Sequence, residues 1–131
     1  MNFPEKLLYT KDHEWISVTG EKGHIGISDY AQTHLGDIVY IELPEMDMEA
    51  TQGEAIGVIE SVKAVASFLC PVGGTIVEVN EELEESPELL NQDPYENWIA
   101  VIELSDQKDL DKLMNAQAYT EYCQTLEETE G

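Results

Sequence analysis

Seven short runs rich in Val, Ile and aromatic residues follow one another along the chain, each bounded by turn residues such as Gly, Pro, Asn or Asp. Runs of this length and composition are typical of β-strands, whose branched and aromatic side chains pack well on a pleated surface. They cover residues 13–18, 24–27, 38–43, 54–60, 65–69, 75–79 and 98–104. Because 131 residues fit one domain, the pattern predicts a single β-barrel or sandwich.

Two glycine-containing segments predict hairpin turns between neighbouring strands. Thr19 to Gly23 would connect the first two strands, and Gly73-Gly74 would connect two later ones. Glycine suits such positions because it adopts backbone conformations that other residues avoid. We therefore expect at least two β-hairpins.

Helical signals are confined to three places. Ser28 can cap a short helix over residues 29–35 that ends at Gly36, because a serine hydroxyl accepts from the first free amides and glycine suits the C-terminal turn. Ser86, followed by Pro87, predicts a second helix of one or two turns. Both helices are expected to connect strands.

The third helical signal lies at the C-terminus. Four apolar residues follow the i, i+3, i+4, i+7 spacing that places side chains on one helical face, namely Tyr119, Tyr122, Cys123 and Leu126. We expect this face to pack on the barrel. A shorter apolar face precedes it, formed by Leu110, Leu113 and Met114, with Ser105 or Asp106 as its cap.

A faint internal repeat relates two of the strands. Residues 36–41 (GDIVYI) match residues 74–79 (GTIVEV), with identical Gly, Ile and Val positions. The repeat indicates two similar β-halves that face each other. Lys63 falls on the connection between the halves, so we expect it at an exposed hairpin tip.

Acidic residues dominate the charge of the chain. There are 28 Asp and Glu residues against 6 basic ones, which gives a formal net charge of −22. Such a charge repels nucleic acid and anionic lipid headgroups, so neither a nucleic acid nor a membrane is an expected partner. It suits transient docking on basic protein surfaces, where electrostatics speeds encounter.

The same sequence bears on the compartment. No apolar run approaches the length that spans a bilayer, and residues 1–15 lack the basic end and apolar centre of a secretory signal. Cys70 and Cys123 are too few for a disulfide framework and too far apart for a CxxC pair. We expect a soluble protein with reduced thiols, in the cytoplasm or, if a transit peptide was removed, in the mitochondrial matrix.

Lys63 stands in the sequence GVIESVKAVAS at residues 57–67, between two strand-like runs. Its neighbours Val62 and Ala64 neither pair with an ammonium nor crowd it. Most lysines are solvated surface groups, and that interpretation stays open. The alternative is a covalent attachment point, because a rigid turn can present an exposed amine to an acylating enzyme. The hairpin context and the repeat favour attachment.

Five sequence blocks together resemble one known family. They are YTKDHEW at residues 9–15, GISDYAQTHLGDIVYIELPE at 26–45, ESVKA at 60–64, PVGGTIVEVNEEL at 71–83 and ESPELLNQDPY at 85–95. In this order, from about residue 8 to residue 123, the chain is similar to the H protein of the glycine cleavage system. Val62 and Ala64 fit that family better than acyltransferase lipoyl domains, which usually have Asp before the lysine, or biotin carriers, which usually have Met on both sides.

The resemblance implies a fold. It is mainly β, a flattened lipoyl-domain-like barrel-sandwich hybrid with an N-terminal β-hairpin extension and short C-terminal helices. Residues 1–131 would form a single lipoyl-carrier domain. Within it the hairpin extension covers about residues 8–27, the barrel core about 36–104 and the C-terminal helices about 105–127.

The resemblance also implies a cofactor and partners. Lys63 would carry lipoic acid in amide linkage, and Glu60, Val62 and Ala64 would form the context that a lipoyl ligase or lipoyltransferase recognises. Family members are carriers rather than enzymes. They take an aminomethyl group from a pyridoxal phosphate dependent glycine decarboxylase to a tetrahydrofolate-dependent aminomethyltransferase, and electrons to dihydrolipoamide dehydrogenase. The cofactor then supplies thiol and disulfide chemistry while the protein supplies position and recognition.

Two other interpretations use the same hairpin. The chain could be a lipoyl donor in lipoate salvage or in a protein-to-protein lipoyl relay. It could also be an unmodified interaction module that kept the fold. Transfer of labelled lipoate to an acceptor domain would support the relay.

Family members shelter the loaded arm in a groove of the carrier, and the matching blocks give candidates for its wall. Glu14, with Asp12 in support, would hold the amine of the cargo, because a carboxylate pairs well with an ammonium in a partly desolvated cleft. The family commonly has Asp where this chain has Ser67, which weakens the charge expected there. His34, at the end of the short helix, would flank the groove, although a helix-terminal histidine without such a role is the alternative.

The remaining candidates give no further site. His13-Glu14 would begin a zinc-protease HExxH motif, but Ser17 occupies the position of the second histidine. His24 has no neighbouring ligand, so no metal is expected. We expect Cys70 to be a buried and unreactive thiol, and the acidic residues 81–85 to form a solvated face.

Overall fold

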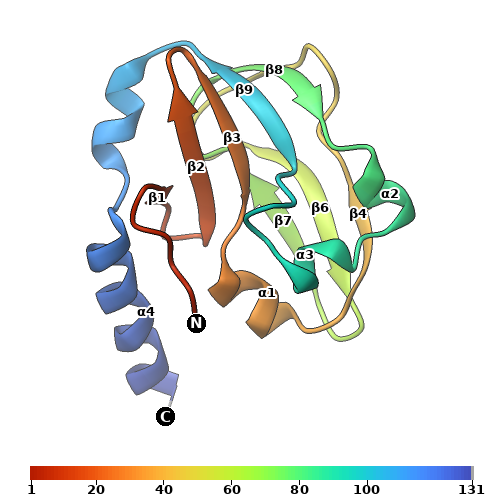
Figure 1. Cartoon of the computed structure of the whole chain (residues 1–131), viewed down its shortest axis with the longest axis vertical. Helices are drawn as coiled ribbons and strands as arrows, with labels where there is room; N and C mark the ends of the chain where they lie inside the picture. Colours follow the sequence, from red (N-terminus) through yellow and green to blue (C-terminus); the bar gives the residue numbers. More distant parts are fainter. Residues whose placement is uncertain (131) are drawn as a thin grey trace.

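Two antiparallel sheets form the centre of the molecule (Figure 1). The computed structural model describes residues 1–130. The first sheet has the order β1-β2-β3-β9-β8-β5, with bounds Leu8–Tyr9, Glu14–Thr19, Lys22–Ile27, Ala100–Leu104, Gly74–Val79 and Glu49–Ala50. The second has the order β4-β6-β7, with bounds Ile38–Glu42, Ala55–Ser61 and Val65–Leu69. The mainly β barrel-sandwich architecture is therefore confirmed.

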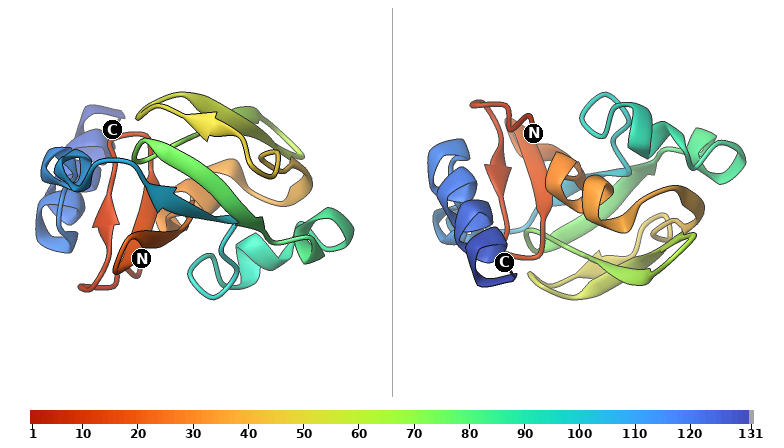
Figure 2. Two further views of the ribbon diagram at one scale, coloured as in Figure 1. Left: turned by 90° about the horizontal axis from the view of Figure 1, so that it is seen from above. Right: turned by 90° about the horizontal axis from the view of Figure 1, so that it is seen from below.

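The main hydrophobic core lies between the two sheets. Ile25, Ile76 and Ile102 from the first sheet are each 0% exposed, and Ile59 and Phe68 from the second are each 1% exposed. Burying such side chains stabilises a fold by roughly 1.5 to 3 kcal/mol each. Figure 2 shows the two layers from above and below. The core holds the sheets together and fixes the position of every loop between them.

All seven predicted strands are present, and β1 and β5 are additional. Each of the additional strands has only two residues, which is too short to leave a periodic signal. The repeated segments form β4 and β8, which lie in different sheets. Within residues 1–130 no helix is both long and apolar enough to cross a membrane.

One predicted hairpin is correct and the other is wrong. Gly20, with a φ of 65°, turns β2 into β3, and Thr19 pairs with Lys22. At Gly73-Gly74, by contrast, the chain crosses from β7 to β8 in the other sheet, so no hairpin forms. A Cβ on Gly74 would overlap the carbonyl oxygen of Glu103. Glycine is needed there because two strands approach closely, and not because the chain turns.

The first helix is as predicted and the second begins later than predicted. Helix α1 (Asp29–Leu35) is capped by the Ser28 hydroxyl and ends at Gly36, whose φ is 77°. Ser86 ends helix α2 (Glu82–Glu85) instead of opening the next helix, and Glu88 precedes helix α3 (Leu89–Gln92). The glutamates of the acidic residues 81–85 are all exposed, as expected of a solvated face, while Leu83 within α2 is completely buried.

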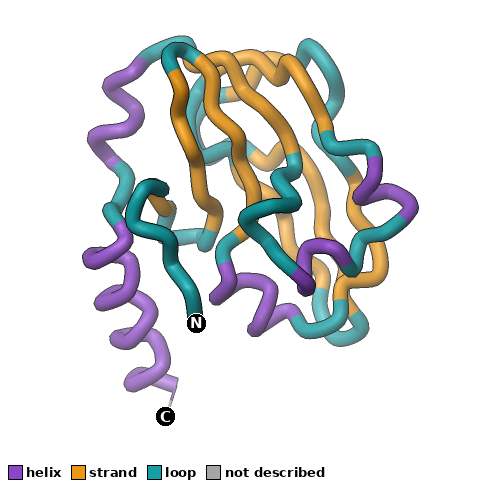
Figure 3. The backbone as a smooth tube through the Cα atoms, in the orientation of Figure 1, coloured by secondary structure: helices purple, strands orange, loops and turns teal. Residues whose placement is uncertain are grey.

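Of the two C-terminal helices, only the last packs elsewhere than expected, since Leu110 and Leu113 pack against the main core. Asp106 caps the 3₁₀-helix η1 (Gln107–Lys112), as one of the two predicted alternatives. Helix α4 (Ala116–Glu130) buries Tyr119 against Tyr9 of β1, with parallel rings 4.5 Å apart, and not against the barrel. The tube in Figure 3 shows this helix beside the N-terminal segment. Apolar spacing identifies a helix but not the surface that receives it.

Candidate functional site

The turn between β6 and β7 presents Lys63 to solvent. The Ser61 hydroxyl accepts hydrogen bonds from the backbone amides of Lys63 and Ala64, at 3.3 and 3.0 Å. The Ser61 amide donates to the Ala64 carbonyl at 2.8 Å. Val62 on the other side of the lysine is 68% exposed. These local bonds close the turn and leave the Lys63 amine accessible.

The loop that follows α1 contacts this turn. The Val62 amide donates to the Asp37 carbonyl at 2.9 Å. A Cβ on Gly36 would lie 3.4 Å from Cε of Lys63, so the aliphatic stem of the lysine passes over this glycine. The position of Lys63 is therefore set by α1 as well as by its own hairpin.

Asn91 of α3 fixes the supporting loop. Its Oδ1 accepts from the amide of Ile38 at 2.8 Å, and its Nδ2 donates to the Gly36 carbonyl at 2.8 Å and to Oε1 of Gln32 at 3.1 Å. The bonds to Gly36 and Ile38 fix the backbone on both sides of Asp37, whose carbonyl accepts from the Val62 amide. Asn91 was not identified from the sequence, because its hydrogen-bond partners are more than fifty positions away.

The four predicted groove residues line one cavity of about 210 Å³. Asp12, Glu14, His34 and Ser67 supply polar groups, and Ile27, Ala31, Leu35, Ile59 and Ala66 supply an apolar wall. The lining comes from β2, β3, α1, β6 and β7 with the loop before β2. In Figure 2, α1 lies between the N-terminal strands and the β6–β7 hairpin. The cavity is thus amphipathic, and two of the strands that line it, β6 and β7, flank the lysine turn.

Glu14 is the buried polar group of this cavity. Its side chain is 3% exposed, and the Thr10 hydroxyl donates to its Oε1 at 2.5 Å. Burial raises the pKa of the Glu14 carboxyl to about 7, and the hydrogen bond from Thr10 partly opposes that rise. A carboxyl that is costly to ionise without a cation favours a positively charged neighbour.

The other three predicted residues are exposed at the mouth of the cavity. Asp12 and Ser67 are exposed, as is His34 in the last turn of α1. The ring of His34 stacks on Tyr30 with centroids 3.9 Å apart, and its Nδ1 lies 2.9 Å from the Tyr30 carbonyl oxygen. Their roles in binding remain predictions.

His13 also lines the cavity, and sequence reasoning missed it. Its backbone is left-handed, with a φ of 72°. Its ring stacks on Tyr30 with centroids 4.4 Å apart, and its Nδ1 lies 2.7 Å from the hydroxyl of Tyr119. Burial lowers the pKa of His13, against the opposing charge of Asp12. The sequence hides this role because Tyr119 is more than a hundred positions away.

The predicted ligase context has a simple geometry. Val62 and Ala64 are exposed on the turn beside the lysine. Glu60 is half-buried on β6 and pairs with Tyr40 of β4 and Val65 of β7. Val65 is 69% exposed and Tyr40 is 51% exposed. An approaching enzyme would therefore meet an apolar surface with a carboxylate at its centre.

Cys70 lies behind Glu14, at a second cavity of about 170 Å³ that Glu14 also lines. The thiol is 1% exposed and donates to the Val72 carbonyl at 2.9 Å. Burial raises the pKa of Cys70 to about 12, which keeps it as the weakly nucleophilic thiol. Its lack of reactivity stays a prediction. Among the described residues, no group of three or more His, Cys, Asp or Glu side chains is placed to hold a metal.

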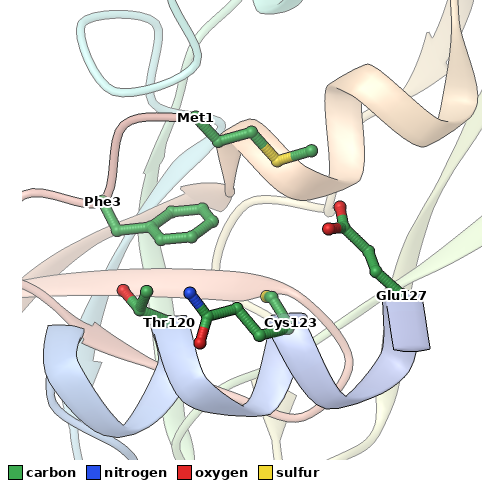
Figure 4. A pocket seen from close by; sticks show the side chains of 6 residues that line it. Met1, Phe3, Thr120, Cys123 and Glu127 are labelled. Carbon is green, nitrogen blue, oxygen red and sulfur yellow. The ribbon is translucent and has the colours of Figure 1, made fainter. Parts of the chain in front are cut away.

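A more voluminous cavity, of about 490 Å³, lies between the N-terminal segment and α4. Figure 4 shows Met1 and Phe3 opposite Thr120, Cys123 and Glu127. In Figure 1 this helix and the β6–β7 turn lie on opposite sides of the molecule. Volume alone therefore does not identify the site, since the four predicted groove residues line the smaller cavity of about 210 Å³.

Comparisons with known proteins identify the family to which the chain is similar. The sequence model of the family described as "Glycine cleavage H-protein" matches residues 7–126. A glycine cleavage system H protein of Syntrophomonas wolfei is 53% identical over 124 residues, covering 95% of each chain. One from Halothermothrix orenii is 52% identical over 128 residues, covering 97% of this chain and all of the relative.

A solved structure matches as well. The crystal structure of a glycine cleavage system H protein from Mycobacterium marinum superposes with a TM-score of 0.84 at 32% sequence identity. The match covers 91% of this chain and 97% of that one. The sheets and helices described above are thus shared with a relative of known structure.

Proposed function

The chain belongs to the glycine cleavage H-protein family, and we propose from this membership that Lys63 is its lipoyl attachment site. The protein is then a carrier and not an enzyme. It takes an aminomethyl group from glycine decarboxylase to the aminomethyltransferase and passes electrons to dihydrolipoamide dehydrogenase. The observation that carries the proposal is an exposed lysine on a turn closed by its own hydrogen bonds, beside an amphipathic cavity.

The residues at the turn fit an amide-linked arm. Lys63 is exposed, and its neighbours Val62 and Ala64 leave room for an acylating enzyme. Gly36 offers a flat surface under the stem of the lysine. When attached, the lipoyl group supplies a dithiol and disulfide pair that can take up a one-carbon amine and electrons. The chain holds the attached end of the arm in a fixed position, from which the lipoyl group reaches the partner enzymes.

The cavity residues would shelter the cargo. Ile27, Leu35 and Ile59 exclude water along the apolar wall, and a dry wall strengthens every charge interaction beside it. Glu14 and Asp12 would hold the amine of the cargo. An ammonium beside Glu14 favours the ionised carboxylate, so binding the cargo lowers the pKa, which in the free carrier is raised to about 7, mainly by burial. Cargo binding and release of a proton from Glu14 are thereby coupled.

The surface charge would select the partners. A net charge of −22 steers the carrier towards basic surfaces and speeds its encounter with several enzymes in turn. The partners are the two glycine cleavage enzymes, dihydrolipoamide dehydrogenase and the ligase or transferase that attaches lipoate. Because they must share a compartment, the carrier works in the cytoplasm or, in cells that hold the system there, in the mitochondrial matrix.

A reconstituted system tests the proposal. Lipoylated protein, the three purified enzymes and carboxyl-labelled glycine should release labelled carbon dioxide in proportion to the carrier. Lys63→Arg keeps the charge but cannot be acylated in the same way, so it should abolish release. Lys108→Arg, a change at another exposed lysine, should retain full activity. Full activity of Lys63→Arg would refute the carrier role.

A further inference from the structure

Two histidine rings line the cavity and both stack on Tyr30. Each ring has its Nδ1 in a hydrogen bond to another part of the chain, which leaves Nε2 as its remaining polar atom. A neutral histidine has one donor and one acceptor nitrogen, and the bond at one nitrogen fixes the role of the other. The two Nδ1 partners differ, so the two rings offer different groups to a ligand.

His34 offers an acceptor. Its Nδ1 lies 2.9 Å from the carbonyl oxygen of Tyr30, and a carbonyl oxygen can only accept. Nδ1 of His34 therefore carries the proton, and Nε2 of the neutral ring is the acceptor.

His13 offers a donor, and the reason lies in a buried chain of hydroxyls. Ser28 is 0% exposed, and its Oγ accepts from the Ala31 amide at 3.2 Å as the cap of α1. The hydroxyl proton of Ser28 needs a partner, and Oη of Tyr119 lies 2.7 Å away. A buried hydroxyl proton without an acceptor is destabilising. Ser28 therefore donates to Tyr119.

This direction fixes the tautomer of His13. Because Tyr119 accepts from Ser28, its own proton is available to Nδ1 of His13, 2.7 Å away, or to the sulfur of Cys123, which is another side-chain partner of Tyr119. A ring nitrogen is a stronger acceptor than a thiol sulfur, so Tyr119 donates to Nδ1. Nδ1 is then the acceptor and Nε2 carries the hydrogen. Burial lowers the pKa of His13, which favours the neutral ring. The backbone adds to this arrangement, since the Ser28 amide donates to the His13 carbonyl at 2.9 Å.

We propose that His13 is a further ligand-binding residue of the groove, whose Nε2–H donates to a sulfur of the lipoyl arm. The inference rests on the proposed function. Asp12, His13 and Glu14 are consecutive and all line the cavity. An amine held by the two carboxylates is separated from sulfur by a single carbon, which brings the sulfur beside the intervening histidine. That sulfur is a thioether in the loaded arm, and a thioether sulfur accepts a weak hydrogen bond, which ionised carboxylates cannot donate.

The donor is tested first on the protein without lipoate. Long-range proton–nitrogen NMR correlations distinguish the two tautomers of each histidine at neutral pH. We expect the Nε2–H form for His13 and the Nδ1–H form for His34. Tyr119→Phe removes the hydroxyl and should shift His13 towards the mixture of tautomers expected of a ring whose Nδ1 has no fixed partner. An Nδ1–H form in the native protein, or no change in Tyr119→Phe, overturns the proposal.

The contact with sulfur is tested on the loaded carrier. His13→Phe keeps an aromatic ring to stack on Tyr30 but removes both nitrogens, and it should release the cargo into buffer about tenfold faster, the effect of one lost hydrogen bond. His13→Asn, whose side chain tolerates a left-handed backbone, should also release it faster, and His24→Phe should not. Unchanged release in both His13 variants overturns the binding role.

The two measurements separate this inference from the proposed function. A native protein that accepts no lipoate refutes the proposed function and the sulfur contact together, whatever the tautomer of His13. A lipoylated and active carrier with an Nδ1–H tautomer at His13 refutes only the further inference.

Discussion

The lysine turn and the groove beside it are built in opposite ways. The turn is made by four consecutive residues, Ser61 to Ala64, that close it with their own hydrogen bonds. The groove is assembled from strands, a helix and a loop that are distant in sequence, and its key carboxyl is 3% exposed. An attachment point must be recognised by another enzyme, so it is exposed and formed by residues that are consecutive in the sequence. A shelter must exclude water, so it depends on the whole fold.

The largest effect is expected on lipoate attachment, which should depend on the lysine turn and not on the groove. Lys63→Ala should abolish incorporation of labelled lipoate by a lipoyl ligase, because it removes the acylated amine. Glu14→Gln should leave incorporation within about twofold, because the ligase meets the turn and not the groove. Incorporation is measured by label bound per protein after a fixed time.

Two controls keep that comparison sound. Circular dichroism and thermal unfolding should show that Lys63→Ala folds like the native protein, since a solvated surface lysine contributes little to stability. If Glu14→Gln lost incorporation as completely as Lys63→Ala, the turn and the groove would not be separate units.

A second prediction concerns stability and pH in the groove. The folded-state pKa of Glu14, about 7, exceeds its ordinary value of 4.5, so folding favours the protonated form. The stabilisation of the folded state by protonated Glu14 is fully present below pH 4.5 and is lost as pH rises through 7. Glu14→Gln has no carboxyl to ionise and does not lose this stabilisation. The free energy of unfolding of the variant minus that of the native protein should therefore rise by about 3 kcal/mol between pH 4.5 and pH 8.

Urea unfolding of the cargo-free proteins at several pH values measures that difference. The comparison between variant and native protein removes the effect of the other acidic residues, which titrate in both. A difference that does not change with pH would mean that Glu14 has the same pKa in the folded and the unfolded protein. Thr10→Ala provides a related check, because losing its hydrogen bond should raise the pKa of Glu14 further.

The contrast also explains what the sequence could predict. Strand composition, the Ser28 cap and the position of Lys63 are local features, and all were predicted correctly. Gly73-Gly74 was mistaken for a hairpin because a glycine required by close strand approach resembles a glycine required by a turn. Asp12, Glu14, Ser67 and His34 were named from a resemblance, and only the fold shows that they share a cavity.

The groove residues that were missed have distant partners. His13 depends on Tyr119, and Asn91 supports a loop that follows α1. Neither residue has a local pattern that reveals the contact. The C-terminal helix illustrates the same limit, since its apolar face was recognised while its packing against Tyr9 was not.

A third prediction tests whether the turn depends on the fold beneath it. Asn91→Ala should lower the free energy of unfolding by about 2 kcal/mol, because it leaves the Ile38 amide without its acceptor. Hydrogen exchange at the Val62 amide should also become faster, since Asp37 loses its support. Asn2→Ala, at an exposed position, serves as the control and should change stability by less than about 0.5 kcal/mol. Unchanged exchange at Val62 would show that the turn is independent of α3.

The smallest effect is expected from a substitution that introduces a carboxylate at the groove, where the family commonly has Asp. Ser67→Asp should slow the loss of cargo from the loaded carrier by about twofold, because an exposed carboxylate attracts the amine only weakly through solvent. Stability should change by no more than about 0.5 kcal/mol. Raising the salt concentration should reduce the benefit, and a benefit that persists at high salt would indicate a contact other than charge.

The central claim is that Lys63 carries the lipoyl group. The most direct measurement is the intact mass of the protein from cells supplied with lipoate, followed by fragment mapping of the peptide that contains Lys63. The account predicts a single lipoyl increment, located on that lysine and absent from the other five. No increment in cells with a demonstrated lipoyl ligase, or an increment on another lysine, would contradict it.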